Sequence, residues 1–178
     1  MENSLEWIIA FWAILKSGFR PLLINMRLPD DAIYKAFADC GVQAVISSER
    51  QFNITTLKYS ELDENSCALK VDKFGEEIFF MSSGTSYNVK ICAYTAEKLF
   101  NQLGSVIKII GSCGKIKEHY NGHIKLLTIL PFYHIFGFCA AYLWFCFFSR
   151  TLVYLKDLSP DTLLNTIKKH EVTHIFAV

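Results

Sequence analysis

The residues that decide the fold are 21–47, PLLINMRLPDDAIYKAFADCGVQAVIS. Residues 21–24 form a short apolar run that is typical of a strand, and residues 42–47 form a second one. Between them, Pro29 is typical of a helix start and Gly41 of a helix end, with apolar residues recurring on one face. A helix between two apolar strands is the repeating unit of a parallel sheet. We therefore expect an α/β fold with a mixed or parallel sheet flanked by helices.

The alternation of strands and helices continues on both sides of this stretch. Before it, Asn3 and Glu6 form a capping-box pattern at the start of an apolar helix that ends near Gly18. After it, the apolar spacing predicts strands at residues 54–59, 78–81, 124–130, 151–155 and 172–178, and helices at residues 95–110, 132–148 and 159–170. We expect residues 1–178 to be a single, partial α/β domain.

The composition narrows the class of protein. The 178 residues are 52% hydrophobic and 15% aromatic, which suggests an excerpt of a larger protein or contact with a membrane. A net charge of +1 and the lack of a basic-aromatic stripe argue against nucleic-acid binding. The six cysteines include no CxxC pair, so we expect reduced thiols in a cytoplasmic protein. The N-terminus also has no basic region of the kind that opens a secretion signal.

Residues 129–148, ILPFYHIFGFCAAYLWFCFF, are long and apolar enough to suggest a membrane span. Pro131 and Gly137 interrupt the first half, His134 lies between them, and no basic cluster flanks both ends. We interpret the run as a buried helix of a globular core and expect no membrane span. A membrane-spanning or membrane-dipping segment is the alternative.

A cluster of hydroxyl residues around one glycine follows the apolar run 78–81. A strand that ends in small residues leaves backbone N–H groups free to face an anion, and a lysine after the cluster adds positive charge. The pattern is neither a Walker A loop nor a nucleophile elbow. It predicts a phosphate cradle, with an ordinary turn rich in serine and glycine as the alternative. The candidate phosphate-binding residues are Ser82, Ser83, Gly84, Thr85, Ser86 and Lys90.

Residues 130–137, LPFYHIFG, form a second candidate motif. A histidine near the aromatic start of a helix can line a substrate pocket, or it can be a core histidine bonded to a backbone carbonyl. The pairs His119 with His123 and His170 with His174 have metal-like spacing, but neither pair lies within one continuous predicted helix. We therefore expect no metal site built from side chains alone.

Taken in order, three segments resemble the adenylate-forming acyl-CoA synthetase family, the AMP-binding enzymes. They are the hydroxyl-rich loop with its lysine, the LPxxHxxG pattern at residues 130–137, and LSPDTLLNTIKKHEVTHIFAV at residues 158–178. Residues 3–47 also resemble that family. The resemblance implies activation of a carboxylic acid with ATP and Mg²⁺ to an acyl-adenylate, followed by transfer to a thiol, often coenzyme A.

The resemblance also implies residue roles. The hydroxyl-rich loop and Lys90 would hold the ATP phosphates, with Lys90 and His134 as the candidate catalytic residues. His134 would lie near the carboxylate of the acid, in a pocket shaped by Phe132, Phe136 and Gly137. Because residues 132–148 contain no Asp or Glu that could hold an ammonium group, a fatty or aryl acid is the expected substrate.

The chain departs from the family pattern within the loop. Tyr87 replaces a glycine, Val89 a proline and Ile91 a second glycine. The segment before the first helix, the later Mg²⁺-binding and ribose-binding segments, and the C-terminal domain with its catalytic lysine are also missing from these residues. We expect part of a large N-terminal domain that is inactive without the missing C-terminal domain of the same protein. The alternative is a truncated or degenerate relative that acts as a binding or interaction module.

Overall fold

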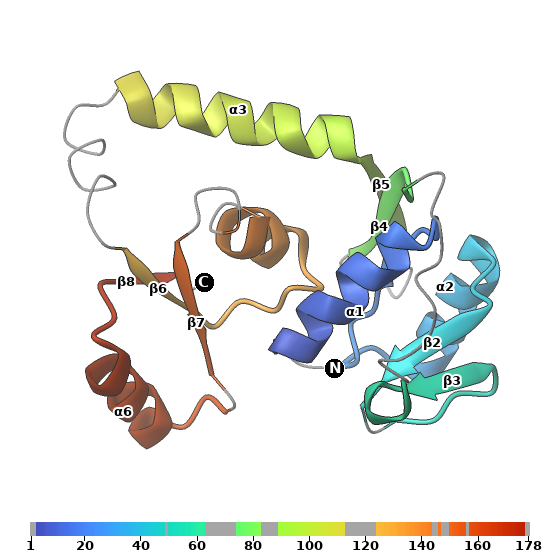
Figure 1. Ribbon diagram of the computed structural model, residues 1–178. Helices are drawn as coiled ribbons and strands as arrows, with labels where there is room; N and C mark the ends of the chain where they lie inside the picture. Colours follow the sequence, from blue (N-terminus) through green and yellow to red (C-terminus); the bar gives the residue numbers. More distant parts are fainter. Residues whose placement is uncertain are drawn as a thin grey trace. The chain divides into compact units, whose positions relative to one another are not determined.

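The computed structural model describes residues 3–48, 50–62, 74–82, 89–112, 124–143, 146, 150–155 and 157–176 (Figure 1). The chain forms two compact units, Met1–Tyr94 and Thr95–Val178. Each contains parallel strands and helices, which confirms the mixed α/β class with sheets flanked by helices.

The first unit contains two small sheets and two α-helices. β1, β4 and β5 form one sheet in that order, and β2 pairs with β3 in the other. The pairings of β1 with β4 and of β2 with β3 are parallel: Leu22 of β1 lies opposite Phe79 of β4, and Ala44 of β2 lies opposite Thr55 of β3. The elements are α1 (Leu5–Lys16), β1 (Leu22–Leu23), α2 (Asp30–Cys40), β2 (Ala44–Ser47), β3 (Thr55–Lys58), η1 (Tyr59–Glu61), β4 (Glu77–Ser82) and β5 (Lys90–Thr95).

The ends of α1 and α2 follow from local hydrogen bonding. The Ser4 hydroxyl caps α1 by accepting a hydrogen bond from the Trp7 backbone N–H at 3.1 Å. The sequence-based expectation of an Asn3 cap was therefore wrong by one residue, because the side chain that reaches the first free N–H belongs to Ser4. Gly41 ends α2 as expected, since its φ of 61° lies in the left-handed region that glycine adopts without strain.

The core of the first unit is built where α2 packs on β1 and β2. Ile33 and Phe37 of α2 contact Val45 of β2 and Phe52, and Leu22 of β1 packs against the same cluster. Ile33 is fully buried. One face of α2 therefore covers both strands.

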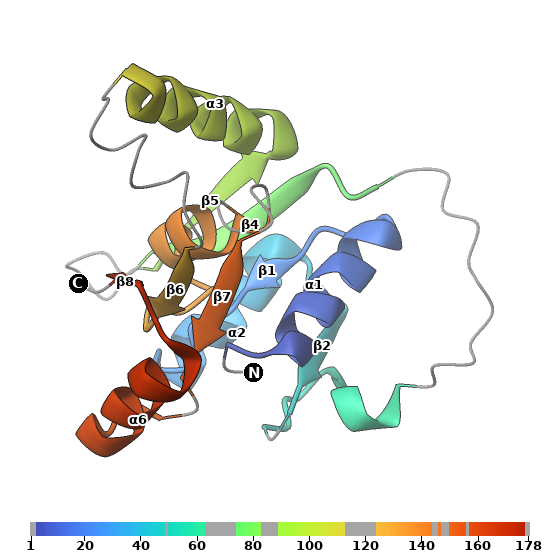
Figure 2. The same cartoon turned by 60° about the vertical axis from the view of Figure 1, so that its left-hand side comes forward.

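The second unit is arranged around a parallel sheet with the order β7-β6-β8 (Figure 2). Leu126 of the central strand lies opposite Leu152 of β7 and His174 of β8. Leu103 of α3 and Ala141 of η2 are buried against this sheet. The elements are α3 (Ala96–Ser112), β6 (Lys125–Thr128), η2 (Gly137–Leu143), β7 (Thr151–Tyr154), α6 (Pro160–His170) and β8 (His174–Phe176).

Within the described part of the apolar run 129–148, several side chains are buried in the core, as expected for a globular protein. Phe138, Ala141 and Tyr142 are fully buried. The expected single helix over 132–148 was wrong in its first part, because residues 132–134 form a turn and a π-helix, Gly137–Leu143, follows. Among the described residues, no helix has the length and apolar character needed to cross a bilayer.

Ile33→Ala should lower the free energy of unfolding by about 3 kcal/mol, because it removes a buried side chain and leaves a cavity. Urea denaturation followed by circular dichroism measures the change. Leu164→Ala is the control: Leu164 is 55% exposed on α6, so its truncation should change stability by less than about 0.5 kcal/mol. Equal losses in the two variants would contradict the assigned core.

Candidate functional site

The first candidate motif lies between two neighbouring strands. Ser82 is the last residue of β4 and Lys90 is the first residue of β5, and these strands are hydrogen-bonded neighbours. Both residues are exposed. Four predicted site residues, Ser83, Gly84, Thr85 and Ser86, lie outside the described residues, as does the atypical Tyr87.

The position of this motif is fixed by β4, because β4 is the central strand of its sheet and is hydrogen-bonded on both sides. Ile78, Phe80 and Met81 of β4 are buried, and the Phe80 ring packs edge-on against Tyr94 of β5 with 5.6 Å between centroids. The start and the end of the connection between the strands are therefore held by backbone pairing and by packed side chains.

Lys90 gives this motif a solvent-facing positive charge. Within the described ranges, no acidic side chain forms an ion pair with it. The Arg20–Glu77 pair lies at the opposite end of β4 from Ser82. The positive charge of Lys90, which starts β5 after the connection from Ser82, is therefore available to bind an anion.

The second candidate motif follows the carboxyl end of β6, the central strand of the second unit. The buried Thr128 hydroxyl accepts a hydrogen bond from the Leu130 backbone N–H at 3.2 Å, which starts the turn. The His134 backbone N–H then donates to the Pro131 carbonyl at 3.1 Å. The turn is thus held by side-chain and backbone hydrogen bonds before the helix begins.

The ring of His134 is oriented by a hydrogen bond to one of its two nitrogens. Its Nδ1 accepts a hydrogen bond from the Phe136 backbone N–H at 3.3 Å. An accepting Nδ1 requires the proton of the neutral imidazole to be on Nε2. Since the side chain is exposed, Nε2–H can donate to an anionic or carbonyl oxygen of a ligand.

Gly137 is required by the close approach of the helix start to the turn. A Cβ at this position would lie only 2.2 Å from the Pro131 carbonyl oxygen, well inside contact distance. Phe132 is fully buried, and its ring packs on Tyr142 with 5.2 Å between centroids. Of the four predicted pocket residues, His134 and Phe136 are therefore exposed, while Phe132 and Gly137 support the turn from inside.

The two candidate motifs belong to different units. Ser82 and Lys90 lie in the first unit, and His134 with its three neighbours lies in the second. Each motif follows the carboxyl end of a strand that is central in its sheet, β4 in one unit and β6 in the other. In α/β proteins, ligands bind beyond this end of the strands.

The described residues offer neither a metal site nor a reactive thiol next to the His134 motif. They contain no group of three or more His, Cys, Asp or Glu side chains that could hold a metal ion. His119 and His123 lie outside the described residues. Burial raises the pKa of the Cys139 thiol, next to the His134 motif, to about 11. At neutral pH this thiol is protonated and is therefore a poor nucleophile.

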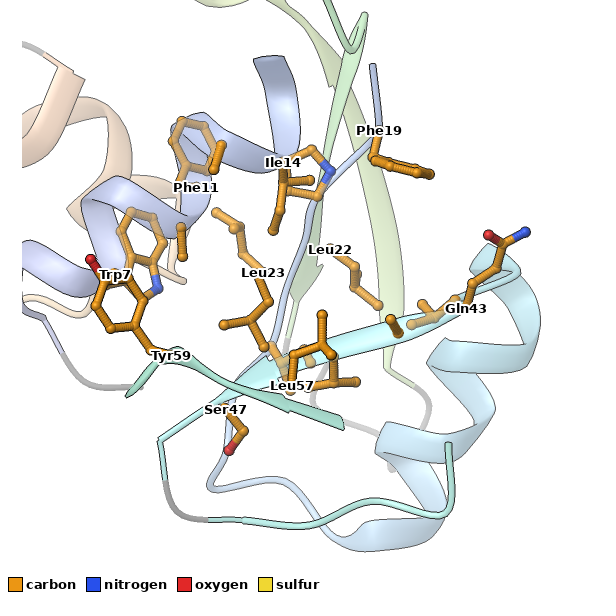
Figure 3. A pocket seen from close by; sticks show the side chains of 18 of the residues that line it. Trp7, Phe11, Ile14, Phe19, Leu22, Leu23, Gln43, Ser47, Leu57 and Tyr59 are labelled. Carbon is orange, nitrogen blue, oxygen red and sulfur yellow. The ribbon is translucent and has the colours of Figure 1, made fainter. Parts of the chain in front are cut away.

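Sequence reasoning missed a cavity of about 940 Å³ in the first unit, between α1 and strands β1, β2 and β3 (Figure 3). Trp7, Phe11, Leu23, Ser47 and Tyr59 are among its lining residues. The sequence of α1 offered one indication of it. This helix is apolar nearly all round, which favours burial on more than one face.

Gly137→Ala should lower the free energy of unfolding by about 1–3 kcal/mol, because the added methyl group would overlap the Pro131 carbonyl oxygen. Thermal or urea unfolding measures the loss. The matched control is Gly104→Ala in α3, where nothing lies within 4 Å of an added Cβ. Because alanine has the higher helix propensity, that variant should be neutral or more stable by up to about 1 kcal/mol. A Gly137 variant as stable as the Gly104 variant would contradict the close contact.

Comparison with known proteins supplies a family and a fold. A family profile described as AMP-binding enzyme matches residues 1–178. Among curated proteins, none matches the chain. Among solved structures, o-succinylbenzoate CoA synthetase (MenE) from Bacillus subtilis, in complex with the acyl-adenylate intermediate OSB-AMP, is similar with a TM-score of 0.79 and 21% identity. The match covers 99% of this chain and 47% of that chain.

Two further structures share the fold. The NpsA N-terminal subdomain from Klebsiella oxytoca, in complex with 3-hydroxyanthranilyl-AMSN, has a TM-score of 0.73 and 18% identity, covering 99% of this chain and 44% of that one. The amide bond synthetase McbA from Marinactinospora thermotolerans has a TM-score of 0.68 and 16% identity, covering 98% and 38%. The chain therefore spans less than half the length of these structures. The likeness confirms the fold expected from the sequence.

Proposed function

The chain belongs to the AMP-binding enzyme family, and from that premise we propose that its protein is an acid–thiol ligase. It activates a carboxylic acid with ATP and Mg²⁺ to an acyl-adenylate, releases pyrophosphate and passes the acyl group to a thiol. The observation that carries the proposal is the family match over the whole chain, which includes the strand–loop–strand element bounded by Ser82 and Lys90. The resemblance drawn from the sequence pointed to the same family.

In this proposal the hydroxyl-rich loop and Lys90 hold the phosphates of ATP. Lys90 suits that role because it is exposed and, within the described ranges, forms no ion pair with an acidic side chain. Its ammonium group would offset the negative charge that builds up on the departing pyrophosphate. The loop residues with the same role are Ser82, Ser83, Gly84, Thr85 and Ser86.

Mg²⁺ would arrive with the nucleotide. The described residues contain no cluster of ligands able to hold a metal alone. Mg²⁺ in nucleotide sites is often bound through substrate phosphates with only one or two carboxylates. In this proposal the chain binds the nucleotide phosphates, and those phosphates carry Mg²⁺ into the site.

His134 is the proposed partner of the acid. Its Nδ1 is engaged by the Phe136 N–H, so its Nε2–H can donate to a carboxylate oxygen and orient it. Gly137 and Phe132 hold the turn that presents this ring. Phe136, which is 47% exposed, offers an aromatic surface beside it. These contacts would orient the acid and exclude water from one side of it.

An aryl acid is the substrate class we favour over a fatty acid. No acidic residue of the 132–148 segment is available to hold an ammonium group, so an amino acid would be poorly bound. An exposed phenylalanine ring favours edge-to-face or offset packing with an aromatic acid. The structures with the same fold also carry aryl ligands, OSB-AMP in MenE and 3-hydroxybenzoyl-AMSN in NpsA. Because MenE is a CoA synthetase, we propose coenzyme A as the acceptor thiol.

We further propose that residues 1–178 are part of a large N-terminal domain and do not catalyse adenylation without a C-terminal domain. The partners would be small molecules and that domain, in the cytoplasm, where unpaired cysteines stay reduced. The rival proposal is a non-catalytic module, favoured by Tyr87 and Val89 in place of the family's glycine and proline. Activity and binding measurements separate the two.

Lys90→Ala should weaken ATP binding about tenfold, because a charge-assisted bond to phosphate contributes roughly 1.5–3 kcal/mol. Isothermal titration calorimetry with MgATP measures the affinity. Lys35→Ala makes the same change in charge at an exposed position on α2 and should leave affinity unchanged. If both variants bind like the unmodified chain, the phosphate role of Lys90 is wrong.

ATP–pyrophosphate exchange should be undetectable for residues 1–178 with 3-hydroxybenzoate, o-succinylbenzoate or hexadecanoate. The physical reason is that the chain spans less than half the length of the structures that share its fold, so the reacting groups would not be held together or shielded from water. Robust exchange by this chain would overturn the proposed dependence on a C-terminal domain. In a longer form of the protein, exchange with the aryl acids would support the ligase, and ATP binding without any exchange would support the module.

A further inference from the structure

A buried hydroxyl group marks the carboxyl end of β6. Of the serine and threonine residues that the structure describes, only Thr128, which is 1% exposed, and Ser47 are buried. Leu126 and Leu127 of the same strand are apolar and fully buried. A hydroxyl removed from water costs free energy unless it is hydrogen-bonded, so valine would suit the packing of the strand better than threonine. What the hydroxyl bonds to therefore decides its role.

The Thr128 hydroxyl is bonded to the backbone of the turn that follows β6. Its oxygen accepts a hydrogen bond from the Leu130 N–H at 3.2 Å, and its O–H donates to the Leu130 carbonyl at 3.5 Å. Local bonds from a threonine side chain to the nearby backbone favour a turn over a continued strand. The hydroxyl therefore ends the strand and starts the turn at one defined residue.

The position of Thr128 is itself fixed by the sheet. Thr128 is the last residue of the central strand, and it lies opposite Tyr154 of β7 and Phe176 of β8. Its β-branched side chain has few rotamers available. Backbone pairing on both sides and a stiff side chain therefore hold the hydroxyl in place as an anchor for the turn.

The turn connects this anchor to the ring of His134. The Pro131 carbonyl, which follows Leu130, accepts a hydrogen bond from the His134 N–H at 3.1 Å. Gly137 packs against the same carbonyl, since an added Cβ would lie 2.2 Å from its oxygen. Between these two contacts, the Phe136 N–H donates to His134 Nδ1 at 3.3 Å. The orientation of the ring therefore depends on the direction of the Pro131 carbonyl, and the residue before Pro131 sets that direction.

An exposed ring needs an anchor of this kind. His134 is exposed, so packing does little to hold its side chain. A group that binds a ligand has to be held within roughly 0.5 Å of its productive position. Hydrogen bonds that lead back to a buried residue of the central strand can supply that precision.

We propose that Thr128 is a positioning residue for His134. Its hydroxyl fixes the Leu130 backbone and, through the Pro131 carbonyl, holds the imidazole ring so that the Nε2 edge faces the acid. Thr128 is fully buried and does not touch the acid itself. The role toward the acid rests on the proposed function, whereas the orientation of the ring rests on the hydrogen bonds of the turn alone.

The test compares Thr128→Val, which removes the hydroxyl, with Thr128→Ser, which keeps it. NMR-detected hydrogen exchange of residues 1–178 follows the amides of His134 and Phe136. In Thr128→Val these amides should exchange about tenfold faster, because the bonds that protect them open more often. Thr128→Ser should exchange like the unmodified chain. The matched control is Ser47→Ala, which removes the other buried hydroxyl, at the end of β2, and should leave both amides unchanged.

The amide of Leu127, within β6, separates positioning from a general loss of stability. If exchange at Leu127 rises in Thr128→Val by the same factor as exchange at His134 and Phe136, the hydroxyl only stabilises the fold, and the proposal is overturned. Unchanged exchange at His134 and Phe136 would also overturn it. If Thr128→Val does not fold, Thr128→Ser decides, because fast exchange at the two amides in that variant would show that the hydroxyl is not the anchor.

Titration with 3-hydroxybenzoate, followed through the ring resonances of His134, gives the second readout. Thr128→Val should bind this acid at least about threefold more weakly, because the ring is no longer held in place. Its affinity for MgATP should not change, because Lys90 belongs to the other unit. Equal affinity of Thr128→Val and the unmodified chain for the acid would contradict the proposal. If the ring of the unmodified chain does not respond to the acid but exchange behaves as expected, the proposed role of His134 is wrong, and its orientation by Thr128 is supported.

Discussion

Parallel pairing of strands is the constraint on which both units depend. Strands that run the same way cannot be joined by a tight turn, so the chain must cross over through a helix or a long connection. Leu22 consequently pairs with Phe79, and Leu126 pairs with both Leu152 and His174. The crossovers place helices on the sheet faces and leave the carboxyl ends of strands open. Both candidate motifs arise at such ends, after β4 in one unit and after β6 in the other.

The two candidate motifs present different chemical groups to a ligand. At Lys90 the protein places an exposed positive charge beside a connection between two hydrogen-bonded strands. At His134 it uses a hydrogen bond: the Phe136 backbone N–H occupies Nδ1, which leaves Nε2 to face a ligand. The exposed charge of Lys90 suits an anion of high charge, such as a phosphate group. The hydrogen-bonded ring of His134 suits a carboxylate oxygen that must be held in one orientation. Gly137 is structural in this scheme, because its missing side chain lets the helix start approach the Pro131 carbonyl.

Much of the fold could be predicted from apolar spacing and helix-end residues. The helix ended by Gly41, the strand near residues 55–58 and the helix that begins after Thr95 were all expected, and the Thr95 hydroxyl accepts a hydrogen bond from the Lys98 N–H at 3.3 Å. The Asn3 cap was wrong because sequence pattern does not determine which of two adjacent polar side chains reaches the free N–H. The helix expected over 132–148 was wrong in its first part because hydrogen bonds from the Leu130 and His134 N–H groups hold a turn there, and a π-helix follows at Gly137.

The sequence by itself determined the alternation of strands and helices, the family, and the residue types of both candidate motifs, because these depend on local pattern and on chemistry carried by single side chains. Only the tertiary structure decided which residues face solvent. It placed Phe132 in the core but left Phe136 and His134 exposed, and it revealed the cavity between β1 and β2. The physical reason is that burial and strand-edge pairing depend on segments far apart in the chain, and no local pattern records which of them meet.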